Sequence, residues 1–205
     1  AVLAAAGHAI ALLNPLRTHR FAAVDLERTK TDAIAALTIA RFAAHKRPAT
    51  TPLPDALTEE LRELVQLRQR LVQDFGDRVR QLHRLVDLGF PEFTRYVRTL
   101  DSELASAILR DYPTATAFRG VSVRRLAAMR YDGHHRVGLD LARQLIAAAP
   151  RSVGQHHSAT YRLQIRYACD DLDTLRRRLR DLDCDLDRKL HQHEVGRLLT
   201  TIDGI

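Results

Sequence analysis

The sequence is poor in aromatic residues and cysteine, and it has no tryptophan. Phe, Trp and Tyr make up 5% of the 205 residues, so Leu, Ala, Val and Ile must supply most of the core. The hydrophobic share of 45% is ordinary for a globular chain. Cys169 and Cys184 fall on one predicted helix, where their separation corresponds to about 22 Å and excludes a disulfide bond. We therefore expect free thiols and a reducing, cytoplasmic setting.

Long apolar runs are also missing, which excludes a predicted transmembrane helix. The apolar start, Ala1 to Ala6, has no basic residues before it, so it does not resemble a signal peptide. We expect the chain to begin within a domain and to be independent of membranes.

Positive charge exceeds negative charge. There are 32 Lys and Arg against 25 Asp and Glu, a net charge of +7. Guanidinium groups bind phosphates through paired hydrogen bonds, so an excess of Arg favours DNA or RNA as partner. The candidate nucleic-acid-binding residues are Lys30, Arg41, Lys46, Arg47, Arg124 and Arg125. The alternative is a set of solvated helix faces, which we prefer for the Arg176–Arg178 cluster because Asp residues are mixed with it.

The first part of the chain carries the one strand signal. The short apolar run from Ala9 to Leu13, closed by Asn14 and Pro15, predicts a buried strand of an α/β sheet. Thr31 is a good N-cap for a helix that reaches Lys46. Prolines at 48, 52 and 54 then predict a stiff linker.

Helical periodicity dominates the rest of the sequence. Apolar residues at three- and four-residue steps predict a long helix over 57–88, and shorter helices are expected over 101–111, 122–130 and 137–149. A last helix has an unbroken heptad row from Tyr161 to Leu186, which is typical of a coiled coil. It could pair with 57–88 of the same chain or with a second chain.

The helix start at Lys30-Thr31-Asp32 is the strongest candidate for chemistry. An Asp in the first turn of a helix beside a sheet can ligate a divalent metal, and two metals can drive phosphodiester transfer. Mg²⁺ prefers carboxylates and water, but one Asp does not make such a site. Asp32 could instead simply stabilise the helix dipole. The spacing of the His pairs does not fit a metal site, and Ser122 is interpreted as a helix cap.

With the Asn14-Pro15 stretch, this helix start resembles the DEDD-type insertion-sequence transposases, relatives of the Piv-type DNA invertases and known as bridge-RNA-guided recombinases. Lys30, Thr31, Asp32 and Ala36 match the family pattern Lys-Thr-Asp-x-x-Asp-Ala. The segment Asp111 to Thr114, the long final helix and residues 201–205 resemble later parts of the family in the same order.

The resemblance implies an RNase-H/RuvC-like α/β domain, a coiled-coil region and a C-terminal domain bearing a Ser. It also implies DNA cutting and rejoining by an acidic tetrad with Mg²⁺, guided by an RNA. Asp32 would be the catalytic and metal-binding residue. Ala35 occupies the position of the second Asp, and the other acids and the Ser domain are absent. We therefore expect this chain alone to be inactive.

The resulting prediction is a mostly α chain with an incomplete α/β remnant. Residues 1–47 would be the end of the RuvC-like domain, 48–56 a linker, 57–198 the helical coiled-coil region and 199–205 the start of a C-terminal transposase domain. Transposition and DNA recombination are the expected function, with self-association through the coiled coil. The alternative is a non-catalytic helical module that binds nucleic acid and dimerises.

Overall fold

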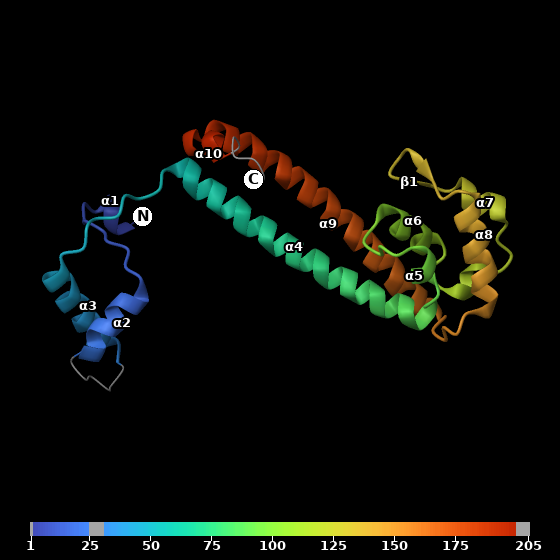
Figure 1. Cartoon of the computed structure of the whole chain (residues 1–205), viewed down its shortest axis with the longest axis horizontal. Helices are drawn as coiled ribbons and strands as arrows, with labels where there is room; N and C mark the ends of the chain where they lie inside the picture. Colours follow the sequence, from blue (N-terminus) through green and yellow to red (C-terminus); the bar gives the residue numbers. More distant parts are fainter. Residues whose placement is uncertain (1, 25–30, 200–205) are drawn as a thin grey trace. The chain divides into compact units, whose positions relative to one another are not determined.

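The computed structural model describes residues 2–24 and 31–199 (Figure 1). Helices account for 71% of the residues and strands for 2%, which confirms a mostly α chain. The chain divides into two compact units, 1–55 and 56–205. None of the helices in the described ranges is long and apolar enough to cross a membrane.

The first unit contains α1 (Val2–Ala5), α2 (Pro15–Val24) and α3 (Asp32–Lys46). Helices α2 and α3 pack together through the rings of Phe21 and Phe42, whose centroids are 5.4 Å apart at an edge-to-face angle of 90°. The guanidinium of Arg17 lies over the Phe42 ring, 5.7 Å from its centroid. Phe42 and Thr38 are the buried residues of α3, so the core of this unit is small.

The predicted strand over 9–13 is wrong, because these residues form no strand. Their backbone instead meets the Pro-rich segment: the Thr51 amide donates to the Ile10 carbonyl at 2.8 Å, and the Leu12 amide donates to Thr51 Oγ1 at 2.9 Å. An apolar run becomes a strand only where neighbouring strands satisfy its backbone, and the described residues of this unit provide none.

Asn14 and Pro15 begin a helix rather than end a strand. The Asn14 side chain accepts the Leu16 amide at 2.9 Å, and Pro15 is the first residue of α2. Asn is a preferred N-cap and Pro is favoured at the first helical position, since its missing N–H would have no partner there anyway. The same dipeptide is therefore a helix-start signal, which we interpreted from the sequence as the end of a strand.

The second unit is built on an antiparallel pair of long helices, α4 (Ala56–Gly89) and α9 (Ala159–Gln192), which lie side by side in Figure 1. Cross-helix contacts define the register, from Thr58 Oγ1 with His193 Nε2 at 3.0 Å to Tyr161 Oη donating to the Leu85 carbonyl at 2.6 Å. The structure thus pairs the two predicted long helices within one chain.

The two helices are joined by a compact group of short elements, residues 90–158, which we call the head. These elements are α5 (Phe93–Tyr96), α6 (Glu103–Asp111), η1 (Ala115–Phe118), α7 (Val123–Ala128), β1 (Arg130–Tyr131), β2 (His135–Arg136), α8 (Leu139–Ala148) and η2 (Ala149–Arg151). The expected helices over 101–111, 122–130 and 137–149 correspond to α6, α7 and α8. A short helix, α10 (Glu194–Leu199), follows α9.

The apolar core lies between the head and the adjoining part of the long helices. Fully buried members include Leu82 and Val86 of α4, Ile165 and Leu172 of α9, and Phe90 of the head. Gly154 of the head packs directly on Gly89, where a Cβ at Gly154 would lie 2.6 Å from the Gly89 carbonyl oxygen. The head and the end of the hairpin therefore form one close-packed body.

Candidate nucleic-acid interface and helix start

Asp32 is the first residue of α3, and its side chain is exposed. Thr31 Oγ1 accepts the Ile34 amide at 3.3 Å, which confirms Thr31 as the N-cap. This cap fixes Asp32 in the first turn, where a carboxylate complements the helix dipole. Lys30, the predicted neighbour of this site, lies outside the described residues.

Ala35 is exposed one turn further along α3, and its amide donates to the Thr31 carbonyl at 2.9 Å. Its methyl group cannot ligate a metal. Across residues 2–24 and 31–199, no group of three or more His, Cys, Asp or Glu side chains is arranged to hold a metal ion. The helix start therefore offers one carboxylate, and the catalytic and metal-binding role of Asp32 stays a prediction.

Arg41, Lys46 and Arg47 are exposed on the second half of α3 and at its end. Arg47 is the C-cap, with a left-handed φ of 41°, and its amide donates to the Ala43 carbonyl at 2.9 Å. Arg41 and His45 line an open hollow of about 500 Å³ beside Phe21. Cations near a helix C-terminus also stabilise the helix, so their position serves the fold as well as any phosphate contact.

Arg124 and Arg125 are exposed in the first turn of α7. Ser122 Oγ accepts the Arg125 amide at 3.2 Å, which confirms Ser122 as a helix cap. Because α7 has six residues, Arg125 also belongs to its last turn, so the dipole argument applies to Arg124, whose cation near the N-terminus does not stabilise the helix. The exposure of both side chains is compatible with binding to an anion.

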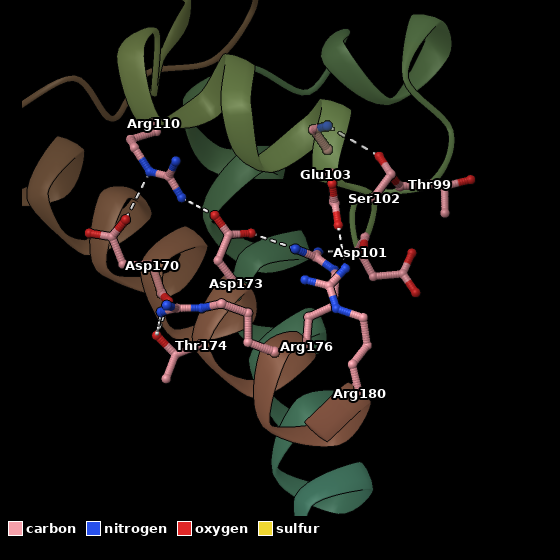
Figure 2. Close-up of polar contacts among 12 residues, drawn as sticks. Thr99, Asp101, Ser102, Glu103, Arg110, Asp170, Asp173, Thr174, Arg176 and Arg180 are labelled. Carbon is pink, nitrogen blue, oxygen red and sulfur yellow. Dashed lines mark hydrogen bonds and ion pairs between the residues drawn. The ribbon is translucent and has the colours of Figure 1, made fainter. Parts of the chain in front are cut away.

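Sequence reasoning missed an ion network between α6 and α9 (Figure 2). Arg110 of α6 pairs with Asp170 at 2.8 Å and also with Asp173, and Asp173 in turn pairs with Arg176 at 2.5 Å. The Arg176 side chain is only 16% exposed and donates to the Asp101 carbonyl at 2.8 Å. It is thus a structural residue rather than a member of a solvated face. Only the Asp173–Arg176 spacing could have signalled this from sequence.

Next to this network is a hollow of about 700 Å³ bounded by α6, α9 and the β1–β2 hairpin. Its wall contains arginines from three elements: Arg110, Arg130, Arg176, Arg177 and Arg180. Neither the hollow nor a role for Arg130 was predicted from the sequence. Arg110, Arg130 and the arginines of α9 lie far apart along the chain, and they come together only when α9 packs along the head.

A comparison with protein families matches residues 1–91 to the model of the IS110-type DEDD transposases, described as 'Transposase'. No curated protein and no solved structure matches the chain. The matched segment contains the Asp32 helix start and the whole of α4.

Proposed function

We propose that the chain acts in DNA transposition and recombination as part of an insertion-sequence transposase. The observation that carries this proposal is the family match over residues 1–91, which includes Asp32 at a capped helix start. The basic composition and the exposed arginines of α3 and α7 support a nucleic-acid partner. Recombination guided by an RNA, as in the bridge-RNA-guided relatives, is part of the same proposal.

The metal chemistry of such a transposase would need more carboxylates than the described residues bring together. Asp32 fits as one Mg²⁺ ligand, but Ala35 adds none, so these residues do not fit a two-metal centre. We therefore propose that this chain has no strand-transfer activity by itself, and we derive no reaction step from it.

A metal titration tests the role of the helix start without an activity assay. Ala35→Asp would put a second carboxylate one turn from Asp32, and we expect it to bind Mn²⁺ at least tenfold more tightly than the parent chain, measured by electron paramagnetic resonance. The double variant Asp32→Asn with Ala35→Asp should lose that gain. If Ala35→Asp binds no better, or if the parent chain cleaves DNA with Mg²⁺, the proposed degenerate site is wrong.

For DNA contact we propose Lys30, Arg41, Lys46, Arg47, Arg124 and Arg125. The sharpest test is the pair Arg124→Ala and Arg125→Ala, measured by fluorescence anisotropy with labelled duplex DNA at several salt concentrations. We expect weaker binding and a salt dependence that falls by about 0.9 per lost phosphate contact.

The matched control for this test is Arg62→Ala with Arg188→Ala, which removes the same charge from exposed local ion pairs with Glu59 and Asp185. It should bind almost as well as the parent chain. Equal losses in the test and control variants would show that only overall charge matters.

Self-association through the long helices is the second part of the proposal. On α4, Val65 is 53% exposed although it directly follows Leu64 of the apolar row. Val65→Asp should shift sedimentation toward the monomer without loss of helicity, whereas Val153→Asp, at a 74% exposed loop position, should not. An unchanged oligomer, or a monomeric parent chain, would contradict this part.

The alternative function is a non-catalytic module that binds nucleic acid and dimerises. It is favoured by the compactness of residues 56–205, which form a separate unit that lies mostly outside the matched segment.

A further inference from the structure

We infer that the hollow between the β1–β2 hairpin and helices α6 and α9 binds the phosphodiester backbone of a single nucleic-acid strand. The inference rests on the proposed function and adds a binding site in the second unit that uses residues other than those assigned above.

Three of the four carboxylates that line the hollow are paired with arginines of its wall, and the fourth, Asp132, contacts His135 instead. Glu103 pairs with Arg180 at 2.9 Å, and Asp170 and Asp173 pair with Arg110 and Arg176 (Figure 2). Because these ion pairs neutralise three of the acids and fix the arginine side chains, only Asp132 opposes the remaining cations of the wall.

Two cations are left over. Within the described part of the chain, neither Arg130 nor Arg177 has an acidic side chain at ion-pair distance. Arg177 donates only a long hydrogen bond, 3.4 Å, to Thr174 Oγ1. Both line the hollow, one from the hairpin and one from α9. Their guanidinium groups are free to form the paired hydrogen bonds that phosphate accepts.

The turn of the β1–β2 hairpin, on one side of the hollow, is closed by hydrogen bonds to the side chain of Asp132. Asp132 has a left-handed φ of 49°, and its carboxylate accepts the amides of His134 at 3.1 Å and His135 at 3.0 Å. The hydrogen bond from the His135 amide is the main reason that the pKa of Asp132 is lowered, so the carboxylate stays ionised and keeps the turn closed. A preorganised wall lowers the entropy cost of binding.

Tyr131 adds an aromatic surface to the same wall. Its ring stacks on His135, with centroids 5.8 Å apart and planes at 24°, and it lines the hollow together with Arg130. Aromatic rings beside a cationic groove are the usual features of single-strand binding, because any base can stack on them.

The size and wider charge of the region favour a strand over a duplex. A volume of about 700 Å³ lies within the range of small-ligand pockets, so the hollow is large enough for nucleotides of one strand and too small to enclose a double helix. Residues 101–180, which include every residue that lines the hollow, carry fourteen Arg against seven Asp and one Glu, whereas residues 181–192 carry four Asp, one Arg and one Lys. The positive field is therefore concentrated on the part of the chain that forms the hollow.

The test is anisotropy of labelled oligothymidylate and oligouridylate, each of twelve nucleotides, with the full chain. Arg130→Ala with Arg177→Ala should weaken binding at least tenfold and reduce the salt slope by about 0.7 for each lost contact. The Lys pair at the same positions should restore much of the affinity. Tyr131→Ala should weaken binding several-fold and Tyr131→Phe should not. A preference for oligouridylate would identify RNA as the strand, and a preference for oligothymidylate would identify DNA.

The matched control is Arg80→Ala with Arg188→Ala, which removes two exposed cations that pair locally with Asp77 and Asp185. Binding that is unaffected by the Arg130 and Arg177 changes, or lost equally in the control, would overturn the inference. Circular dichroism must show unchanged helicity in every variant. If duplex binding still depends on Arg124 and Arg125, the proposed function stands even when this inference fails.

Discussion

The two ends of the α4–α9 hairpin follow the same sequence pattern but have different surroundings. At the head-proximal end, residues 71–89 and 159–180, the apolar row meets a second layer of short helices, and Leu82, Val86, Ile165 and Leu172 are fully buried. At the distal end, residues 56–70 and 181–192, the short helix α10 is the further element that packs on α9, and Leu61, Leu64 and Leu186 stay half-buried although Leu182 is buried. Two helices alone cannot enclose an apolar row. Leucines at equivalent positions of the row therefore contribute different amounts to the free energy of unfolding at the two ends.

Thiol reactivity should show the largest difference between the two ends. Cys169 is fully buried at the proximal end and Cys184 is exposed at the distal end. Burial raises the pKa of the Cys169 thiol to about 12, which leaves roughly 10⁻⁴ as thiolate at pH 8. Ellman's reagent should therefore label Cys184 quickly, and a Cys184→Ser variant should react only after denaturation. Equal labelling rates would show that the proximal end is open.

Truncation of matched leucines tests the same difference in stability. Leu172→Ala at the proximal end should lower the free energy of unfolding by about 2–5 kcal/mol, because it leaves a cavity in a closed core. Leu186→Ala at the distal end should cost about 1 kcal/mol, since water already reaches that side chain. Urea denaturation followed by circular dichroism measures both values. Equal costs would mean that the distal end is covered as well, for example by a second copy.

Replacement of a glycine by alanine should have opposite effects on stability in the close-packed head and on the exposed surface of α4. Gly154→Ala would force a Cβ to within 2.6 Å of the Gly89 carbonyl oxygen, so we expect a loss of about 1–3 kcal/mol. Gly76→Ala on α4 meets only the end of the Arg80 side chain at 3.4 Å and should stabilise the helix by about 0.5–1 kcal/mol. Thermal melts of the two variants should move in opposite directions, and two shifts of the same sign would contradict this packing.

The smallest effect is expected from the distal ion pair. Arg68 interrupts the apolar row of α4 and reaches Asp183 of α9 at 2.6 Å, with both side chains about half exposed. A double-mutant cycle of Arg68→Ala and Asp183→Ala should give a coupling of about 0.2–1 kcal/mol that weakens in salt. A coupling above about 2 kcal/mol would indicate a more enclosed contact than the hairpin provides.

Local signals in the sequence predicted the helices but not their surroundings. The caps at Thr31 and Ser122, and the periodic rows of both long helices, depend on neighbours within one or two turns, and the structure has them. The predicted strand over 9–13 is wrong because a strand depends on hydrogen-bonding partners from distant segments. The interpretation of Asn14-Pro15 is wrong because the same dipeptide can follow a strand or begin a helix.

The candidate sites divide in the same way. The Lys30-Thr31-Asp32 pattern could be found from sequence because its residues are contiguous, and the family match over 1–91 agrees with the resemblance that it suggested. The hollow could not be predicted from the sequence, since Arg130 and Arg177 are brought together by α6, α9 and a hairpin whose strands have two residues each. No pattern in the chain marks which arginines keep an acidic partner.

The sequence by itself determined the long helices, the caps at Thr31 and Ser122, the course of the apolar rows and the basic charge of the chain, because these follow from residue spacing and composition. The tertiary structure alone decided that the long helices pair within one chain and which end of the pair is enclosed. It also decided that Arg176 is fixed in an ion network while Arg177 has no acidic partner among the described residues. The reason is physical: burial and ion pairing depend on which surfaces meet, and distant segments meet only when the chain is folded.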